Sequence, residues 1–453
     1  MKRFSQMERR SGSMSSIKSI GTSKARINIY KVLIIVLVSL INAGVAEALP
    51  SFARQTGMSC TACHYSFPEL TPFGRQFKLN GYTMTMAKTI DVKEDSDKVT
   101  RLKLLDALPI SAMIQTSFTH IAKDNEGVQN NSVAFPQQFS LFYAGQIAPH
   151  IGTFIQTTYD GVSFGMDNAD LRYANQTNIG GKSLGYGITL NNNPTVQDGW
   201  NTTSAWGFPY ASSPAANSPT KSTILENMGM QVAGLGAYSL YNNFLFTELT
   251  LYRTCQQGAA NPADATTLMT IDGVAPYWRV ALQHSWGNNY AALGTFGIHS
   301  NHFQTGINGP KDNFTDLGFD FQYAHTMNGG SLTLHSSLIK ETENREDSTL
   351  TSSKYNFNSF KVDGNLYLKN GLGATVCYFN RSGSEDTNIG SLNNKPNSSG
   401  LIYQIEYLPF YNTKFSIQYV AYNKFDGNSV NYDGAGRNAA HNNTIYLLAW
   451  FNF

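Results

Sequence analysis

The sequence predicts an all-β protein, on three observations. From Arg101 to the C-terminus, apolar and polar residues alternate over segments of about ten residues, as in 401–407 and 415–419. Turns rich in Asn and Gly separate these segments. The chain of 453 residues is 41% hydrophobic but has a single long apolar run, which excludes a bundle of membrane-spanning helices of about 20 apolar residues each. Strands with one apolar and one polar face predict an antiparallel barrel that contacts outer-membrane lipid.

Short turns set the number of strands. The markers Asn288, Gly329, Asn370 and Asn412 are 41, 41 and 42 residues apart, so a hairpin repeats every forty-odd residues. Seven hairpin turns join fourteen strands, and the first and last strands bring the total to about sixteen. The turns are 148–150, 180–181, 242–243, 287–289, 328–330, 369–371 and 411–413.

Long polar loops alternate with the short turns, as they do in outer-membrane barrels. An even number of strands puts both ends of the barrel on the rim with the short turns, which is the periplasmic rim. The last strand, 445–453, ends in Phe453, which resembles the assembly signal of bacterial outer-membrane proteins. The long loops lie near 191–228, 256–275, 343–353, 383–398 and 426–440.

Charged residues at inward strand positions predict a polar lumen with internal ion pairs, since both signs are present. They are Arg172, Glu248, Arg279, Asp320, Lys361, Asp363 and Glu406. Over the whole chain, 33 basic residues stand against 31 acidic ones. This balance argues against nucleic acid as a partner.

The N-terminus has the parts of a secretory signal peptide. A basic region precedes the apolar run 32–41, and the small-residue site Ala46-Glu47-Ala48 follows. The ten-residue run is too short for a membrane anchor, so we predict a signal peptide over 1–48, cleaved after Ala48. Export of a barrel of this kind implies the outer membrane of a Gram-negative bacterium. Met14 is an alternative start.

Two cysteines and a histidine form one strong motif. Cys60-Thr61-Ala62-Cys63-His64 reads C-x-x-C-H, the signal for c-type haem attachment. Two thiols at this spacing bond the two vinyl groups of haem, which brings His64 to the iron as the proximal ligand. A thioredoxin-like pair or half a zinc site is the alternative, but no βαβ pattern and no second C-x-x-C accompanies it. The segment 49–100 is thus predicted to be cytochrome c-like, with one covalent haem, and 101–453 to be the barrel.

The sequence predicts less about the two remaining thiols and about the sixth ligand of the iron. Cys255 and Cys377 read as isolated buried or half-buried thiols. No histidine lies between His64 and His120, which excludes a local second imidazole. We predict Met84 as the sixth ligand, with Met86 next, because thioether ligation raises the reduction potential. Met58 lies too close to the motif, and an open position or a ligand from elsewhere in the chain stays possible.

The stretches 51–57, 67–82 and 189–200 resemble the fused monohaem cytochrome-porin family of iron-oxidising bacteria. The resemblance is sharp over 49–82 and looser over the barrel. It implies that Cys60 and Cys63 bind the haem and that His64 is its proximal ligand. It also implies an outer-membrane cytochrome that takes electrons from extracellular Fe(II) and passes them to periplasmic c-type cytochromes. The haem segment is expected on the periplasmic side or inside the lumen.

Two other functions remain at this stage. The haem could exchange electrons with another extracellular partner, or the protein could be a solute porin in which the haem segment is a structural plug. Side chains that suit Fe(II) in the predicted outer loops are not assigned as a site, since acidic outer loops are usually solvated. They are His299, His302, Glu341, Glu343, Glu346, Asp347, Glu385 and Asp386.

Overall fold

The computed structural model describes residues 51–84, 108–125, 127–194, 198–200, 207–255, 270–346 and 354–453. All of them belong to one compact unit, Glu47–Phe453. The predicted signal peptide, 1–48, and Met86 lie outside the described residues. Within the described residues, no helix is long and apolar enough to cross a membrane.

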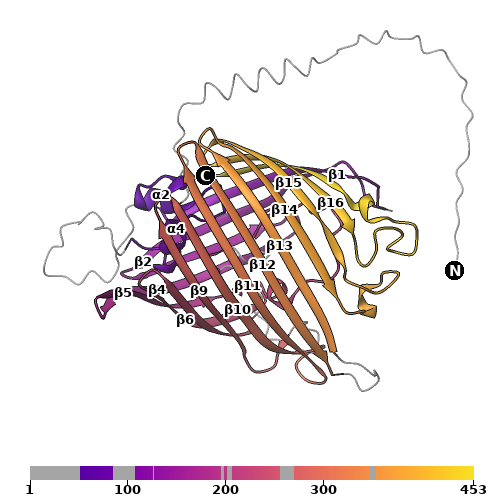
Figure 1. Cartoon of the computed structure of the whole chain (residues 1–453), viewed down its shortest axis with the longest axis horizontal. Coiled ribbons are helices and arrows are strands. Elements are labelled where there is room, and N and C mark those ends of the chain that lie inside the picture. The colour runs from indigo at the N-terminus through magenta and orange to yellow at the C-terminus, as the bar shows by residue number, and fades with distance from the viewer. Residues whose placement is uncertain are drawn as a thin grey trace, which may run out of the picture. The chain divides into compact units, whose positions relative to one another are not determined.

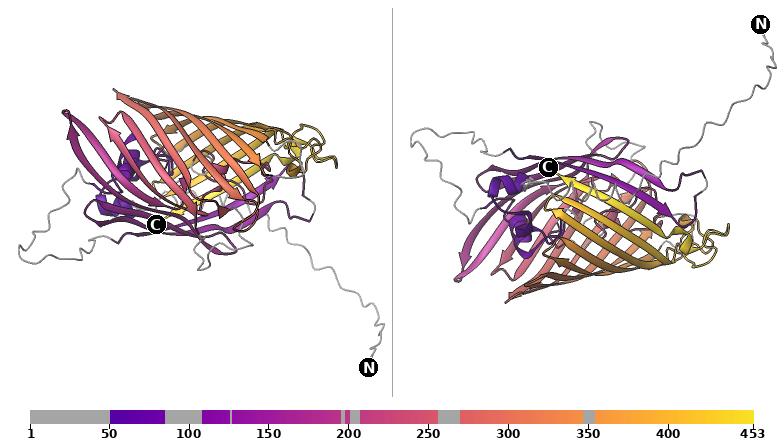
Figure 2. Two further views of the ribbon diagram at one scale, coloured as in Figure 1. Left: turned by 90° about the horizontal axis from the view of Figure 1, so that it is seen from below. Right: turned by 90° about the horizontal axis from the view of Figure 1, so that it is seen from above.

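Strands dominate the described chain and close into a barrel (Figures 1 and 2). Among the described residues there is one 17-stranded sheet, in which β8 (Thr270–Ile271) is a two-residue addition and the other sixteen strands form the ring. All neighbours pair antiparallel, and β1 closes the ring by pairing with both β2 and β17. The strands are β1 (Ile110–Ile121), β2 (Ser132–Ala148), β3 (Ile151–Tyr159), β4 (Phe164–Ile179), β5 (Lys182–Asn191), β6 (Val232–Tyr241), β7 (Leu245–Thr254), β9 (Ala275–Trp286), β10 (Asn289–Phe303), β11 (Lys311–Met327), β12 (Gly330–Arg345), β13 (Lys354–Leu368), β14 (Leu372–Gly383), β15 (Ser398–Phe410), β16 (Thr413–Lys424) and β17 (Thr444–Asn452).

The structure confirms the predicted all-β fold and its sixteen strands. Each of the seven predicted turns joins two paired strands on one rim of the barrel. Asn242 and Asn243 show why Asn is used there, since both have positive φ, 53° and 49°. The start of β1 lies on the same rim as these turns, as does the end of β17, because Met113 pairs with Asn452. An even number of strands requires this arrangement.

Alternation along the strands separates a lipid face from a lumen face. In β6, buried Gly234, Gly236 and Tyr238 alternate with exposed positions such as Leu235. Large exposed apolar side chains recur around the ring, and no water-soluble barrel needs such a surface. The closed ring, which leaves no unpaired strand edge, and this apolar exterior define a barrel of the outer-membrane type. These side chains include Leu171, Tyr186, Leu249, Leu293, Phe319, Leu334, Val376, Ile405, Ile417 and Leu447.

The charged residues predicted for the lumen do face inward. Six of the seven are buried, and Lys361 is half-buried. Several are paired as expected: Arg172 Nε lies 2.7 Å from Asp170 Oδ2, and Arg279 Nη2 donates to Asp320 Oδ1 at 2.9 Å. These charges are shielded from water inside the lumen, so their ion-pair partners stabilise them.

We expect Arg279→Met to lower the free energy of unfolding by about 3–5 kcal/mol, because it leaves the Asp320 carboxylate buried without its partner. The two side chains are 1% and 0% exposed. Urea unfolding in detergent, followed by tryptophan fluorescence, measures the change. The matched control is Lys311→Met, whose ion pair with Asp272 is 41% exposed on each side and is screened by water, so its loss should change the free energy of unfolding little. Equal effects of the two substitutions would contradict the account.

Candidate cofactor site

The segment Ser51–Met84, here called the plug, lies inside the barrel at the rim that carries the short turns (Figure 2). It contains three helices, α2 (Ser51–Thr56), α3 (Cys60–Cys63) and α4 (Pro72–Leu79). Hydrogen bonds between the plug and strands around the ring hold it there. From the plug, Gln55 donates to Ala144 O at 2.8 Å and Tyr82 donates to Asp170 at 2.5 Å. From the barrel, Lys414 donates to Phe67 O at 2.5 Å, and Tyr238 and Tyr367 donate to Leu79 O and Glu69, both at 2.6 Å.

Thr71 connects α4 to the cysteine motif. Its Oγ1 accepts from Gly74 N at 3.0 Å, which caps α4, and donates to Ala62 O at 2.7 Å. The Thr71 N–H also donates to Cys63 O at 2.9 Å. Pro72 at the first helical position suits the start of α4. The short-range sequence Thr-Pro-Phe-Gly therefore sets the position of α4 against α3.

We expect Gly74→Ala to displace α4 from the motif. A Cβ at this position would lie 2.2 Å from Cys63 O, which is backbone and cannot move aside cheaply. Overpacking of this kind costs about 1–3 kcal/mol. Limited proteolysis of the plug and the yield of covalent haem measure the effect. Gly329→Ala is the control, since nothing lies within 4 Å of its added Cβ, and a resistant plug in the Gly74 variant would contradict this packing.

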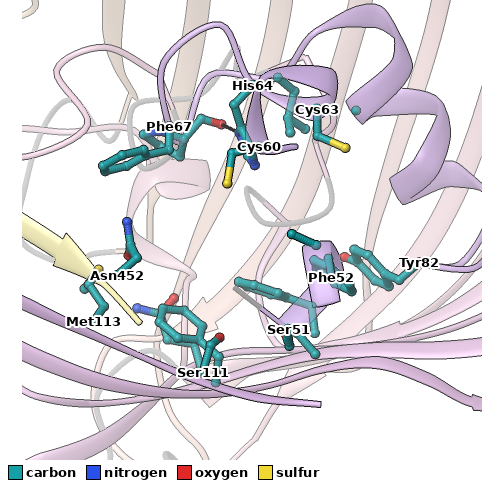
Figure 3. A pocket seen from close by; sticks show the side chains of 18 of the residues that line it. Ser51, Phe52, Cys60, Cys63, His64, Phe67, Tyr82, Ser111, Met113 and Asn452 are labelled. Atoms are coloured by element: carbon teal, nitrogen blue, oxygen red, sulfur yellow. Dashed lines mark hydrogen bonds between the residues drawn. The ribbon is translucent and has the colours of Figure 1, made fainter. Parts of the chain in front are cut away.

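The motif residues share one cavity, of about 400 Å³. Cys60, Cys63 and His64 all line it (Figure 3). Its volume is within the range of about 300–1,000 Å³ that is usual for small-molecule and cofactor sites. The walls include several aromatic side chains: Phe52, Phe67 and Phe77 come from the plug, and Phe142, Phe154 and Trp450 come from the barrel.

The two thiols are free and uncharged in this setting. No disulfide joins Cys60 to Cys63. Burial raises the pKa of both thiols, and the pKa of Cys63 reaches about 11, with the neighbouring Cys60 adding to the effect. Both sulfurs are therefore protonated at neutral pH and available for bonds to carbon.

His64 is held as a neutral imidazole. Its Nδ1 lies 3.2 Å from Pro68 O, and a donated N–H at this position leaves the lone pair on Nε2. Burial inside the lumen lowers the pKa of His64 to about 4, although the hydrogen bonds to Pro68 and Glu69 act the other way. A neutral imidazole oriented by a backbone carbonyl is the arrangement in which histidine binds a metal.

These features fit a c-type haem. Two free thiols at C-x-x-C spacing and an oriented neutral imidazole lie against a cavity with aromatic walls, and each part has a place in the attachment chemistry. Polar side chains from the barrel, among them Gln115, Gln138 and Gln156, also reach the cavity. Among the described residues, no group of three or more His, Cys, Asp or Glu is arranged to hold a bare metal ion.

The methionines differ from one another in position. Met84 is half-buried and is not among the residues that line the cavity, so its role as sixth ligand stays a prediction. Of the described methionines, Met58 and Met113 line it. Met113 comes from β1, 49 positions after His64. Its only sequence signal was an inward position on a strand, which it shares with many other residues.

Glu69 links the plug to the barrel wall and was missed from the sequence. Its carboxylate accepts a hydrogen bond from Tyr367 at 2.6 Å and lies 3.4 Å from His335 Nε2. His335 Nδ1 in turn lies 2.8 Å from Asp363 Oδ2. Glu69 is 1% exposed, and burial raises its pKa. This network fixes the turn that follows His64, because Glu69 lies between Pro68 and the start of α4.

The connection between β5 and β6 corrects one expectation. The sequence predicts a polar outer loop near 191–228, but the described part, with α6 (Ile224–Asn227), folds into the lumen. Ile224 N donates to Glu341 at 2.6 Å and Leu225 N to Asp316 at 3.1 Å. Nearer the middle of the connection, Tyr210 lines the cavity. These inward-facing strand carboxylates accept hydrogen bonds from the backbone of the loop. The alternation of apolar and polar residues along the strands does not predict this contact.

Glu346, Glu385 and Asp386 lie in connections between strands, as predicted, but four other candidate Fe(II) ligands lie on strands. His299 and His302 lie on β10, and Glu341 and Glu343 lie on β12. The two glutamates are 3% exposed, and Lys221 Nζ lies 2.6 Å from Glu343. Placing these four in outer loops was wrong, because the strands extend further than the turn signals indicate. Asp347 lies outside the described residues.

No family model and no curated protein sequence matches the chain. Among solved structures, the outer membrane channel DcaP of Acinetobacter baumannii is similar with a TM-score of 0.45 and 12% identity, over 76% of this chain and 96% of that chain. The anion-selective porin from Comamonas acidovorans gives 0.45 and 9%, over 76% and 98%. OmpT of Vibrio cholerae gives 0.44 and 8%, over 78% and 100%. The fold assignment rests on the strand pairing described above.

The fold and the site together define a class of molecule: an outer-membrane barrel of sixteen strands, counted over the described chain, whose lumen contains an N-terminal C-x-x-C-H plug.

Proposed function

We propose that the protein is an outer-membrane c-type cytochrome with one covalently bound haem, which oxidises extracellular Fe(II) and passes the electron to a periplasmic c-type cytochrome. The observation that supports the haem is that Cys60, Cys63 and His64 line a single cavity with aromatic walls. The choice of Fe(II) follows from the sequence resemblance. A redox centre inside a barrel is useful when electrons must cross an insulating bilayer.

The chain's own residues have separate roles in this proposal. Cys60 and Cys63 bond the macrocycle, His64 Nε2 binds the iron, and the hydrogen bond between Nδ1 and Pro68 O orients the ring. Phe142, Phe154 and Trp450 on the barrel side limit water around the site. When bound, the haem supplies a one-electron Fe(III)/Fe(II) couple, so that one Fe(II) is oxidised to Fe(III) for each electron delivered to the acceptor.

The position of the plug favours a periplasmic acceptor. Gln55 of the plug contacts Ala144, close to the short turn that joins β2 and β3. In outer-membrane barrels, the rim with the short turns faces the periplasm. A periplasmic cytochrome would therefore approach the barrel from the side on which the plug lies.

A solute porin with a structural haem plug is the second candidate, and the barrel itself favours it. A ring of sixteen strands is wide enough for an aqueous channel unless something fills it. The described lumen holds both the plug and the inward loop between β5 and β6. Two inserted segments are better explained by a protein that moves electrons than by one that passes solutes.

The test is a stopped-flow spectrum of the oxidised, detergent-solubilised protein mixed anaerobically with Fe(II). We expect the bands of reduced haem to form at a rate that rises with Fe(II) concentration. Dithionite serves as the control for a reducible haem. Reduction by dithionite but not by Fe(II) would contradict Fe(II) oxidation and favour exchange with another extracellular partner. If the protein contains no haem, the solute-porin function is the candidate that remains.

A further inference from the structure

The cysteine motif lines one side of the cavity, with Cys60, Cys63 and His64. The facing side is formed by α2 of the plug, with Phe52, and by β1 of the barrel, with Met113, as Figure 3 shows. Axial ligands bind iron from opposite faces of the haem plane. A sixth ligand must therefore come from the side that faces His64, and on that side β1 of the barrel wall presents Met113.

We propose that the thioether of Met113, on the barrel wall, is the sixth ligand of the haem iron. This inference rests on the proposed haem and assigns a residue that the sequence did not single out. Its consequence is that one iron atom joins the plug, through His64, to the barrel, through Met113. Complete ligation then requires the plug to be docked in a closed barrel.

The surroundings of Met113 fix its side chain in the wall. The residue is 3% exposed and packs with Tyr446, Leu448 and Trp450 of β17, and Phe67 of the plug packs against the same cluster. Pairing of Met113 with Asn452 holds the backbone at the closure of the ring. Gln115 Nε2 donates to Met113 Sδ at 3.9 Å, which orients the sulfur.

Other donors that line the cavity are less suitable. Met58 precedes Cys60 by two positions, which leaves little chain to bring its sulfur to the face of the haem opposite His64. Lys78 also lines the cavity, but although burial lowers its pKa to about 8, it is still an ammonium group at neutral pH and has no lone pair for iron. Of the described residues that line the cavity, His64 is the single histidine. A thioether ligand raises the reduction potential, as an acceptor for Fe(II) electrons requires.

The experiment compares Met113→Leu, Met84→Leu and Met58→Leu in the full-length protein purified with its haem. Leucine keeps the volume and apolar character of each site, so folding is retained. The far-red absorption spectrum of the ferric protein detects the charge-transfer band between methionine sulfur and ferric iron. We expect Met113→Leu alone to lose this band and to lower the reduction potential. A fourth variant, Met113→His, should give the spectrum of two imidazole ligands.

Each result decides the proposal. Persistence of the band in Met113→Leu, its loss in Met84→Leu or Met58→Leu, or its absence from the unmodified protein would overturn it. Haem staining of the unmodified protein on denaturing gels is carried out first. A protein without covalent haem would overturn the proposed function itself, whereas a haem protein with another sixth ligand would overturn only the role of Met113.

Discussion

Substitution of both Cys60 and Cys63 by alanine abolishes covalent haem attachment. Each thiol forms one of the two thioether bonds, and His64 reaches the iron because the motif lies against the macrocycle. Haem staining of denaturing gels and the mass of the purified chain measure the loss. The loss of covalent haem is expected to be complete, because haem that lies in the cavity without a thioether bond is released when the protein is denatured.

Two further cysteines provide matched controls. Cys255 follows the end of β7 and Cys377 is buried in β14, and neither lines the cavity. We expect Cys255→Ala and Cys377→Ala to keep full haem content. Covalent haem in the Cys60→Ala/Cys63→Ala double variant, or its loss in either control, would contradict the assignment of the site.

A bulky residue at position 152 opens the lumen. Gly152 lies on β3, and a Cβ there would lie 2.0 Å from Gly81 O of the plug. Gly81 has a φ of +69°, which favours glycine and limits how its backbone can move away. Gly152→Leu should therefore weaken docking by about 1–3 kcal/mol, which raises the undocked population about 5–150-fold.

Single-channel recording in planar bilayers measures this effect. We expect frequent open events in Gly152→Leu and rare ones in the unmodified protein. Gly364→Leu on β13 is the control, because nothing lies within 4 Å of its added Cβ. Equal conductance in the two variants would show that the plug does not limit flow through the lumen.

The parts of the structure that were predictable depend on local signals. Alternation with period two sets which side of a strand faces lipid, and Asn or Gly at 242–243 and 180–181 sets where hairpins turn. The cysteine motif is likewise local. For these reasons the sixteen strands of the ring, the seven turns and the inward position of Asp363 could all be predicted.

The remaining features depend on contacts between distant residues. Glu69 and His335 are 266 positions apart, and neither has a sequence pattern that points to the other. The loop between β5 and β6 has the polar composition of a solvated loop, although Glu341 and Asp316 bind its backbone inside the lumen. In the sequence, nothing distinguishes Met113 from other inward strand residues, because its place in the cavity depends on the docked plug.

Vectorial electron transfer tests the central claim most directly. The protein is reconstituted into liposomes that enclose a soluble c-type cytochrome, and Fe(II) is added outside under anaerobic conditions. We predict that the enclosed cytochrome is reduced in liposomes with the unmodified protein and stays oxidised with the double variant Cys60→Ala/Cys63→Ala. Reduction of the enclosed cytochrome at the same rate with the double variant, or none with the unmodified haem protein, would contradict an electron path through the plugged barrel.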